Sequence, residues 1–258
     1  MRKLVLPCIA TRQMVVFPGT AVNLNVARAQ SKRACEIATQ TDNLLFVVCQ
    51  KDATVQAPAQ DDCYRVGTIV KITQFVKSQG NNLHIVVEPI ARAYVETIVS
   101  EDKNKHLVAT VIEKTVEVEG YGGIEGEALV RDVRRVMSDF MKLMPKFSKD
   151  VWLIIHTVNN PGLLADFVED NVVADIIDKQ MLLEEFDPIV RLKKLLVILE
   201  HEKEILVAEA KIQEEVRENM DRNQRDYYLR EQLKVIQGEL GEDADLDDDV
   251  IDYKRKIE

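Results

Sequence analysis

Four cysteines and four histidines are the side chains of this chain best suited to ligate a metal or act as a nucleophile. The cysteines are Cys8, Cys35, Cys49 and Cys63, and no two of them form a C-x-x-C pair. The histidines, His84, His106, His156 and His201, lack the H-x-x-x-H or H-E-x-x-H spacing of a helical zinc site. Each cysteine stands among apolar or mixed residues, which is typical of free, buried thiols. We therefore expect unpaired thiols in a reducing compartment and no metal site.

The sequence also lacks the spacings that nucleophilic catalysis and phosphate binding require. It contains no G-x-S-x-G nucleophile elbow and no G-x-x-x-x-G-K-[ST] phosphate loop. Ser148 and Lys149 are adjacent, but neighbours on a helix point in different directions, so Ser148 is interpreted as a helix cap. Carboxylates cluster in solvated runs such as residues 247–249. The sequence predicts a binding or organising module with no catalytic residue, cofactor or metal of its own.

The composition of the chain argues against nucleic acid and anionic membranes as binding partners. The chain has 258 residues, 46% of them apolar and 30% charged, with a net charge of -10. An acidic chain without clustered Lys and Arg is not expected to bind nucleic acid or an anionic membrane surface. Pro7, Arg12 and Gln13 interrupt the first apolar run before it reaches signal-peptide length. No run approaches the roughly 20 apolar residues of a membrane span, so we expect a cytoplasmic protein.

Residues 1–118 read as a strand-rich lobe. Alternating or continuous apolar patterns predict strands at residues 22–26, 44–48, 67–76, 83–87, 93–99 and 107–115. A turn at residues 79–82 predicts a hairpin, and residues 14–17 form a short apolar run before Pro18 and Gly19. One helix is expected at residues 31–39, with Ser31 as its cap. One helix among many short strands favours a small bent sheet or pseudo-barrel.

Residues 119–184 change to a helical period. The glycine-rich segment 117–125 is the best candidate for the boundary between the two lobes. Helices are expected from about residue 128 to 144 and from 151 to 158, and a third begins after Asn160 with Pro161 in its first turn. The helical pattern continues through residues 172–178.

Residues 185–240 predict one long helix. From Pro188 onward the chain has no further proline and no glycine before Gly238, and apolar residues recur mostly every three, four or seven positions. A helix of this length spans on the order of 75 Å at 1.5 Å per residue. A domain of this size cannot cover it, so part of it is expected to project or to pack on other subunits. Residues 241–258 are interpreted as an acidic break followed by the start of another segment.

Several of these motifs resemble one family, the N-terminal regions of Lon-type ATP-dependent proteases (endopeptidase La). The resemblance covers essentially the whole chain and includes VVFPG at residues 15–19, DCYRVGT at 62–68, VEPIARA at 87–93 and PGLLAD at 161–166. The most specific element is QRDYYLREQLKVIQGELG at residues 224–241. The sequence departs from the family at residues 8–11, where CIAT stands in place of a more polar neighbourhood.

The resemblance implies an α+β fold with a PUA-like pseudo-barrel, a helical lobe and a long C-terminal helix. It implies a homohexameric parent that uses ATP and Mg²⁺ and cleaves with a Ser–Lys dyad lying beyond this chain. This region would recognise unfolded, damaged or regulatory proteins and help to assemble the ring. The alternative is a free-standing adaptor with the same substrate-binding domain and no protease parts. The long helix, and residues 253–258 as the start of a segment leading to an ATPase module, favour the first interpretation.

Candidate contact residues in the strand lobe are the apolar side chains at its turns. Phe17 and Pro18, and the hairpin residues Phe75, Val76 and Leu83, could present apolar surface to unfolded chains. The alternative for each is ordinary core packing beside a turn.

Three further candidates lie on the long helix. Met220 is an apolar residue in an otherwise polar stretch, and six converging copies could line a constriction. Ordinary coiled-coil packing is the alternative. Tyr227 and Tyr228 are consecutive and face different ways, so one could meet a neighbouring subunit.

Overall fold

The computed structural model describes residues 2–77, 83–101, 106–114, 122–143 and 148–240. The chain divides into two compact units, Met1–Lys203 and Glu204–Glu258. All strands and the first five α-helices belong to the first unit, which is therefore α+β as the sequence predicts. Residues 115–121, which include most of the predicted boundary at 117–125, lie outside the described residues. So do residues 241–258, which include the predicted acidic break.

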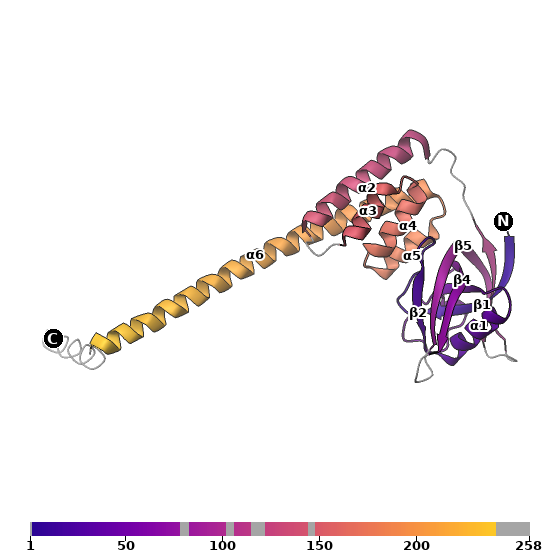
Figure 1. Ribbon diagram of the computed structural model, residues 1–258, viewed down its shortest axis with the longest axis horizontal. Helices are drawn as coiled ribbons and strands as arrows, with labels where there is room; N and C mark the ends of the chain where they lie inside the picture. Colours follow the sequence, from indigo (N-terminus) through magenta and orange to yellow (C-terminus); the bar gives the residue numbers. More distant parts are fainter. Residues whose placement is uncertain (1, 78–82, 102–105, 115–121, 144–147, 241–258) are drawn as a thin grey trace. The chain divides into compact units, whose positions relative to one another are not determined.

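Six strands form one sheet that closes on itself (Figure 1). The strands are β1 (Arg2–Thr11), β2 (Val22–Val26), β3 (Leu44–Cys49), β4 (Val66–Lys77), β5 (Leu83–Glu101) and β6 (His106–Glu113). Their order is β2-β5-β4-β3-β1-β6, and β6 pairs with β5 as well as with β1. This double pairing closes the ring β1-β3-β4-β5-β6 and leaves few free edges. Only β1 and β3 run parallel among the described pairs.

The predicted hairpin is confirmed, but one strand is longer than the sequence indicates. β4 and β5 pair antiparallel on either side of the predicted turn. Residues 83–87 and 93–99, predicted as two strands, are parts of the single strand β5. The ladder shifts between Ile69 and Val70, which pair with Ala91 and Pro89, so Ile90 is the extra residue of a bulge. The bulge accommodates Pro89, which cannot donate to a ladder, and the strand continues.

Two apolar clusters fill the strand-rich part. On β1, Leu6, Cys8 and Ala10 belong to one cluster, and Ile9 belongs to the other. This split follows from the alternation of side chains along a strand. The second cluster includes Ala34, Cys35 and Ala38 of helix α1 (Ala29–Gln40), so α1 covers one face of the sheet. All four cysteines are buried and free, as expected.

Four helices, α2 (Gly123–Leu143), α3 (Lys149–Thr157), α4 (Pro161–Asn171) and α5 (Ile176–Glu184), follow the strands. Asn160 caps α4 and accepts hydrogen bonds from the amides of Gly162 and Leu163, as the Asn-Pro-Gly sequence predicts. Two predicted details are wrong. Residues 172–175 are not helical, because Asp175 caps a new helix. Ser31 is not a cap, because α1 begins two residues earlier, after Arg28.

The long helix is confirmed as α6 (Pro188–Leu240), 53 residues. Within the first unit its side chains Leu192, Leu195 and Leu199 are fully buried. From residue 204 to 238, in the second unit, nearly every side chain is exposed. Within the described residues, no helix combines the length and apolar character needed to cross a membrane.

Candidate functional site

Four buried charged residues join the closed sheet to the helices within the first unit. Arg92 comes from β5, Asp166 and Glu169 from α4, and Arg191 from the first turn of α6. Arg92 donates to both carboxylate oxygens of Asp166, from Nη1 at 2.9 Å and from Nη2 at 2.6 Å. Arg191 Nη2 lies 3.1 Å from the same carboxylate. Asp166 is thus shared by two guanidinium groups, an arrangement that provides strong, directional bonds in a buried site.

Backbone carbonyl groups hold the two guanidinium groups in place. Arg92 Nε donates to the carbonyl of Leu183 at 3.2 Å. Arg191 donates to the carbonyl of Glu185 at 2.9 Å and, with a long bond of 3.4 Å, to that of Gly162. These contacts link β5, the end of α5, the start of α4 and the start of α6. The cluster therefore fixes how the helices lie against the sheet inside this unit.

Glu169 is the least satisfied member of the cluster. Its side chain is fully buried, and within the described residues neither carboxylate oxygen has a hydrogen-bond partner. Arg92 and Arg191 approach it only to 3.8 Å. Burial, and then the nearby charge of Asp166, raise the pKa of Glu169 to about 8, although both arginines act in the opposite direction. The carboxyl group therefore titrates close to neutral pH.

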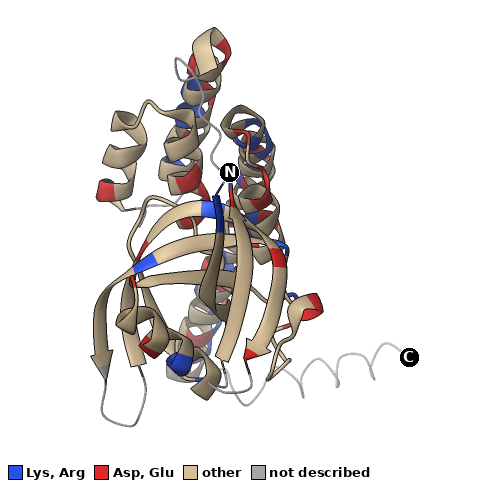
Figure 2. Cartoon of the chain, turned by 90° about the vertical axis from the view of Figure 1, so that its right-hand side faces the viewer, with Lys and Arg blue, Asp and Glu red and all other residues tan. Residues whose placement is uncertain are grey.

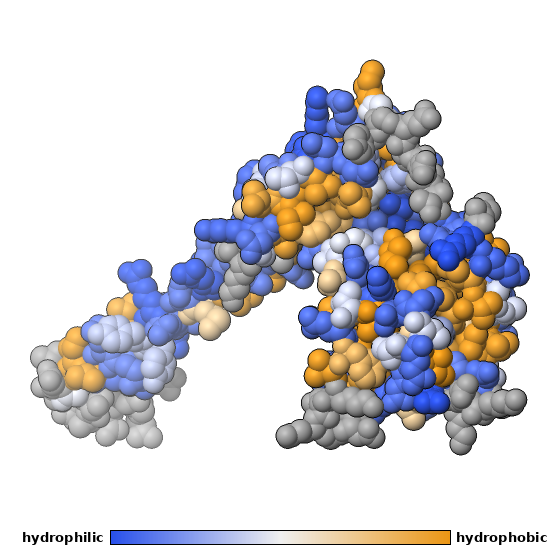
Figure 3. Space-filling view, turned by 45° about the vertical axis from the view of Figure 1, so that its right-hand side comes forward, coloured by the Kyte–Doolittle hydropathy of each residue, from blue (hydrophilic) through white to orange (hydrophobic). Residues whose placement is uncertain are grey.

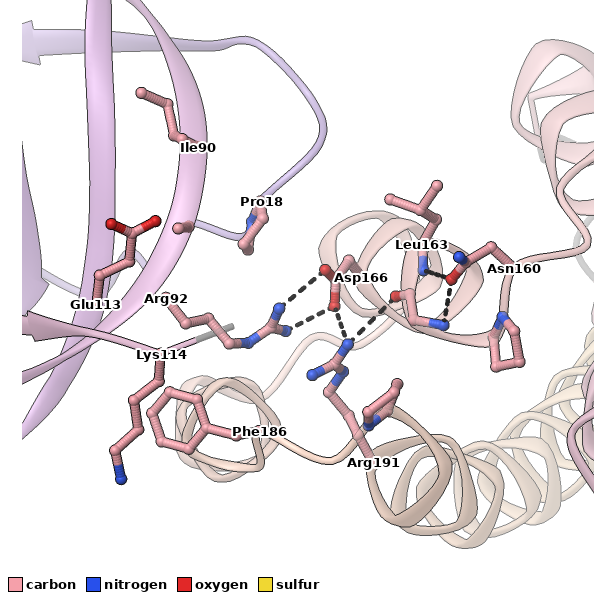
Figure 4. A pocket seen from close by; sticks show the side chains of 14 residues that line it. Pro18, Ile90, Arg92, Glu113, Lys114, Asn160, Leu163, Asp166, Phe186 and Arg191 are labelled. Atoms are coloured by element: carbon pink, nitrogen blue, oxygen red, sulfur yellow. Dashed lines mark hydrogen bonds and ion pairs between the residues drawn. The ribbon is translucent and has the colours of Figure 1, made fainter. Parts of the chain in front are cut away.

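A pocket of about 470 Å³ lies against this cluster (Figure 4). Arg92, Asp166 and Arg191 are among its lining residues, which come from both the sheet and the helices. The apolar part of the lining consists mainly of Pro18, Ile90, Pro161, Leu163, Phe186 and Pro188. The volume is within the usual range of about 300–1,000 Å³ for ligand sites.

Two apolar residues that line this pocket are half exposed to solvent. Ile90 of the β5 bulge is 50% exposed, and Leu163 in the first turn of α4 is 53% exposed. The exposure of Ile90 follows the alternation along β5, in which His84, Glu88 and Ile90 are exposed between buried or partly buried neighbours. Exposed aliphatic side chains around a concave site are typical of a surface that binds other apolar groups.

The polar groups around the pocket leave little capacity for a free anion. The first amides of α4 are already used by the Asn160 cap, and both arginines are paired with carboxylates. Lys114 Nζ lies 4.9 Å from the centroid of the Phe186 ring, where it makes a cation–π contact. The pocket is therefore suited to apolar side chains rather than to phosphate. Among the described residues, no cluster of His, Cys, Asp or Glu could hold a metal ion.

The structure separates the predicted contact residues of the strand lobe. Phe17 and Leu83 are 2% and 3% exposed and belong to the core, which favours the alternative of ordinary core packing for both. Phe17 packs with Leu183, which ties the turn to α5. Pro18, the next residue, lines the pocket.

The remaining predicted contacts are at least partly accessible. Phe75 is half-buried against the sheet cluster, whereas Val76 is 56% exposed. On α6, in the second unit, Met220 is 66% exposed, and Tyr227 and Tyr228 are also exposed. Their roles as contacts stay predictions.

Sequence reasoning missed the four charged residues and the two exposed aliphatic residues of the pocket. One signal was available in α4, where Asp166 and Glu169 are three apart and share a face with buried Ala165 and Val168. Charged side chains on an apolar helix face require partners. No comparable signal marks Arg92 within its strand.

Charged and apolar side chains are unevenly distributed over the molecule. In Figure 2 most red and blue positions lie on helices, and the strands are mostly tan. Figure 3 shows apolar side chains gathered in orange patches between blue regions on the face that it presents. The helices of the first unit contribute exposed apolar residues outside the pocket, including Leu153, Ile177 and Val197.

Comparisons with known proteins agree on one family. The family profile described as the ATP-dependent protease La (LON) substrate-binding domain matches residues 5–201. The Lon protease of Bacillus thuringiensis (strain Al Hakam) is 33% identical over 254 residues, covering 98% of this chain and 32% of that protein. The Lon protease of Fervidobacterium nodosum is 37% identical over 257 residues, covering 98% and 31%. The chain thus spans about a third of the length of these relatives.

Solved structures show the same fold. The N-terminal domain of Mycobacterium avium complex Lon protease superposes with a TM-score of 0.62 at 18% identity, covering 76% of this chain and 98% of that one. A Lon N-terminal domain protein from Xanthomonas campestris gives a TM-score of 0.53, also at 18% identity, covering 75% and 98%.

Proposed function

Because this chain belongs to the family of Lon substrate-binding domains, we propose that it binds unfolded polypeptides through the pocket between its sheet and helices. The ligand would be an apolar side chain of an extended segment. Folded proteins bury most such side chains, whereas damaged or partly synthesised chains expose them. A site that accepts them therefore distinguishes unfolded from native proteins without reading a particular sequence.

The observation that carries this proposal is the contrast between the charged and the apolar parts of the pocket lining. Arg92 and Arg191 share the carboxylate of Asp166, so their charges are already paired within the protein. The apolar residues Ile90 and Leu163 remain half exposed. Burying half of such a side chain against a ligand stabilises the complex by about 1 kcal/mol, at roughly 25 cal/mol per Å². Binding at one pocket is therefore weak and reversible.

We further propose that the bound polypeptides are destined for an ATP-dependent protease, as the names of the relatives imply. In this proposal ATP and Mg²⁺ act outside this region, and the region itself supplies recognition. A free-standing adaptor would use the same pocket.

Self-association is proposed as the role of α6 beyond residue 203. This part of the helix exposes Ile212, Val216, Met220 and Leu233 among charged residues. An exposed apolar series of this kind is stabilised by packing against further copies of the same helix. Association of several chains would bring several weak pockets together and raise the overall affinity for a long unfolded chain.

The test is a binding assay with one substrate in two states. The 258-residue chain is titrated into a fluorescently labelled protein, either native or reduced and carboxymethylated so that it stays unfolded. We expect binding of the unfolded form only. Ile90→Asp should weaken this binding about tenfold, which corresponds to about 1.4 kcal/mol.

The matched control is Ile177→Asp, which introduces the same charge at an exposed isoleucine of α5 that does not line the pocket. It should bind like the unmodified chain. Equal affinity for native and unfolded substrate would refute substrate recognition. An equal loss in both variants would refute the assignment to this pocket.

A further inference from the structure

Glu169 lies beside the two arginines that join the sheet to the helices, but among the described residues it lacks the hydrogen-bond donors that a buried carboxylate requires. Asp166 takes the short bonds from both arginines, and Glu169 is left at 3.8 Å from each. An ionised carboxylate that accepts no hydrogen bond is disfavoured in a buried place, whereas a neutral carboxylic acid costs much less. Burial and the lack of hydrogen-bond donors among the described residues therefore favour the protonated form, against the attraction of the two arginines at 3.8 Å.

We propose that Glu169 is a proton-dependent latch, neutral when the pocket is formed, whose ionisation loosens the contact between α4, α6 and the sheet. Ionised Glu169 has two ways to gain partners. It can draw Arg92 and Arg191 away from Asp166, or it can reach water as α4 moves. Either change displaces the wall that carries Leu163, three residues before Asp166 on the same helix.

The charged groups that act on Glu169 belong to β5, α4, α5 and α6. Arg92 faces it from β5, Arg191 from α6 and Lys179 from α5, and Asp166 lies one turn earlier on α4 itself. Arg134 of α2, a helix that also packs on α4, donates instead to the carbonyls of Ile155 and Val158. Lys179 Nζ donates to the carbonyl of Asp170. The three cations favour ionisation, but burial and Asp166 outweigh them, and the pKa of Glu169 rises to about 8.

The sign of the pH dependence follows from proton binding in the two states. An unfolded glutamate has its ordinary pKa of 4.5, so it has already lost its proton near neutral pH, whereas folded Glu169 keeps its proton up to about pH 8. Between these values the folded state binds more protons, and its stability falls as pH rises. The stabilisation from this group is complete below pH 4.5 and is lost as pH rises through about 8.

The consequence for the pocket rests on the proposed function. If only the protonated form holds the pocket, the apparent affinity follows the protonated fraction. With a midpoint near 8, that fraction falls from about nine-tenths at pH 7 to about one-tenth at pH 9, because each pH unit is a tenfold change. The dissociation constant of an apolar peptide should therefore rise about tenfold over this interval.

The experiment uses the full chain labelled with ¹³C at glutamate carboxyl groups, and Glu169→Gln identifies the resonance. Glutamine keeps the shape of the neutral acid and cannot ionise. We expect the Glu169 resonance to titrate with a midpoint between pH 7 and 9. A blocked, uncharged apolar peptide should bind about tenfold more weakly at pH 9 than at pH 7, and less than about twofold more weakly in Glu169→Gln.

The control is Glu127→Gln, an exposed residue of α2 that pairs only loosely with Arg131, and it should behave like the unmodified chain. A midpoint below pH 6 for every glutamate carboxyl group of the unmodified chain would overturn the latch, and this outcome can be read without any variant. Equal pH dependence in the unmodified chain and in Glu169→Gln would also overturn it. Failure of the peptide to bind at any pH would refute the proposed function instead. The latch is then decided by the titration and by hydrogen exchange of the α4 amides, whose protection relative to the intrinsic exchange rate should fall above pH 8 only when Glu169 is present.

Discussion

Replacing Arg92 by methionine tests whether the buried cluster holds the helices to the sheet. Methionine retains the length and apolar volume of the arginine stem but removes its charge and donors. The variant loses two charge-assisted bonds to Asp166 and one bond to the carbonyl of Leu183. Both partners are nearly buried, with side chains 7% and 6% exposed, so solvent cannot replace the lost contacts.

The expected loss of unfolding free energy is about 3 kcal/mol. Removing one partner of a buried pair costs roughly 3–5 kcal/mol, and Arg191, at 3.1 Å from Asp166, offsets part of this. For a unit of this size the loss lowers the melting temperature by about 6–12 °C. Urea denaturation followed by circular dichroism measures it.

Lys3→Met is the control, because the Lys3–Glu96 pair also involves β5 but is largely exposed. It should cost less than about 1 kcal/mol. A loss below 1 kcal/mol for Arg92→Met, or an equal loss in both variants, would refute the reasoning. The position of the helices would then depend on apolar packing alone.

Two further predictions concern packing and association. Gly67→Ala should destabilise the sheet by several kcal/mol in the same urea assay, because an added Cβ would lie 2.4 Å from the carbonyl oxygen of Val47. In Gly238→Ala, on α6, the added Cβ would meet nothing within 4 Å. This substitution should raise helix stability by up to about 1 kcal/mol. If Gly67→Ala left the free energy of unfolding unchanged, β3 and β4 would be able to separate at little cost. Met220→Asp should weaken any self-association seen by sedimentation at least about tenfold, whereas Asn219→Asp, which adds the same charge one position earlier, should have little effect; equal effects would argue against an apolar contact at Met220.

The sequence predicted the elements whose signals are local. Helix α6 follows from a long stretch without proline or glycine, and the start of α4 from Asn160 and Pro161. The alternating patterns at residues 83–87 and 93–99 predict two strands, whereas β5 is continuous, and the bulge at Ile90 shows how the ladder passes Pro89. A bulge depends on the register with β4, which no local pattern specifies.

The candidate site was predictable only in fragments. Pro18 was singled out by its turn and does line the pocket, whereas its neighbour Phe17 is drawn into the core with Leu183. Arg92 and Asp166 are 74 residues apart, and Arg191 is on a third element. Periodicity shows which face of a helix is buried, but it does not say which distant strand meets that face. The convergence that creates the pocket is therefore a property of the tertiary structure.

The most direct test of substrate recognition is photocrosslinking from the pocket wall. Leu163→p-benzoylphenylalanine places a photoreactive group at a half-exposed residue in the first turn of α4, and Ile177→p-benzoylphenylalanine places the same group at an exposed site outside the pocket. Irradiation with a labelled, carboxymethylated protein should give crosslinks from position 163, and the same protein in its native state should give none. Crosslinking of equal yield from both positions, or from neither, would contradict the assignment of this pocket as the site that binds unfolded chains.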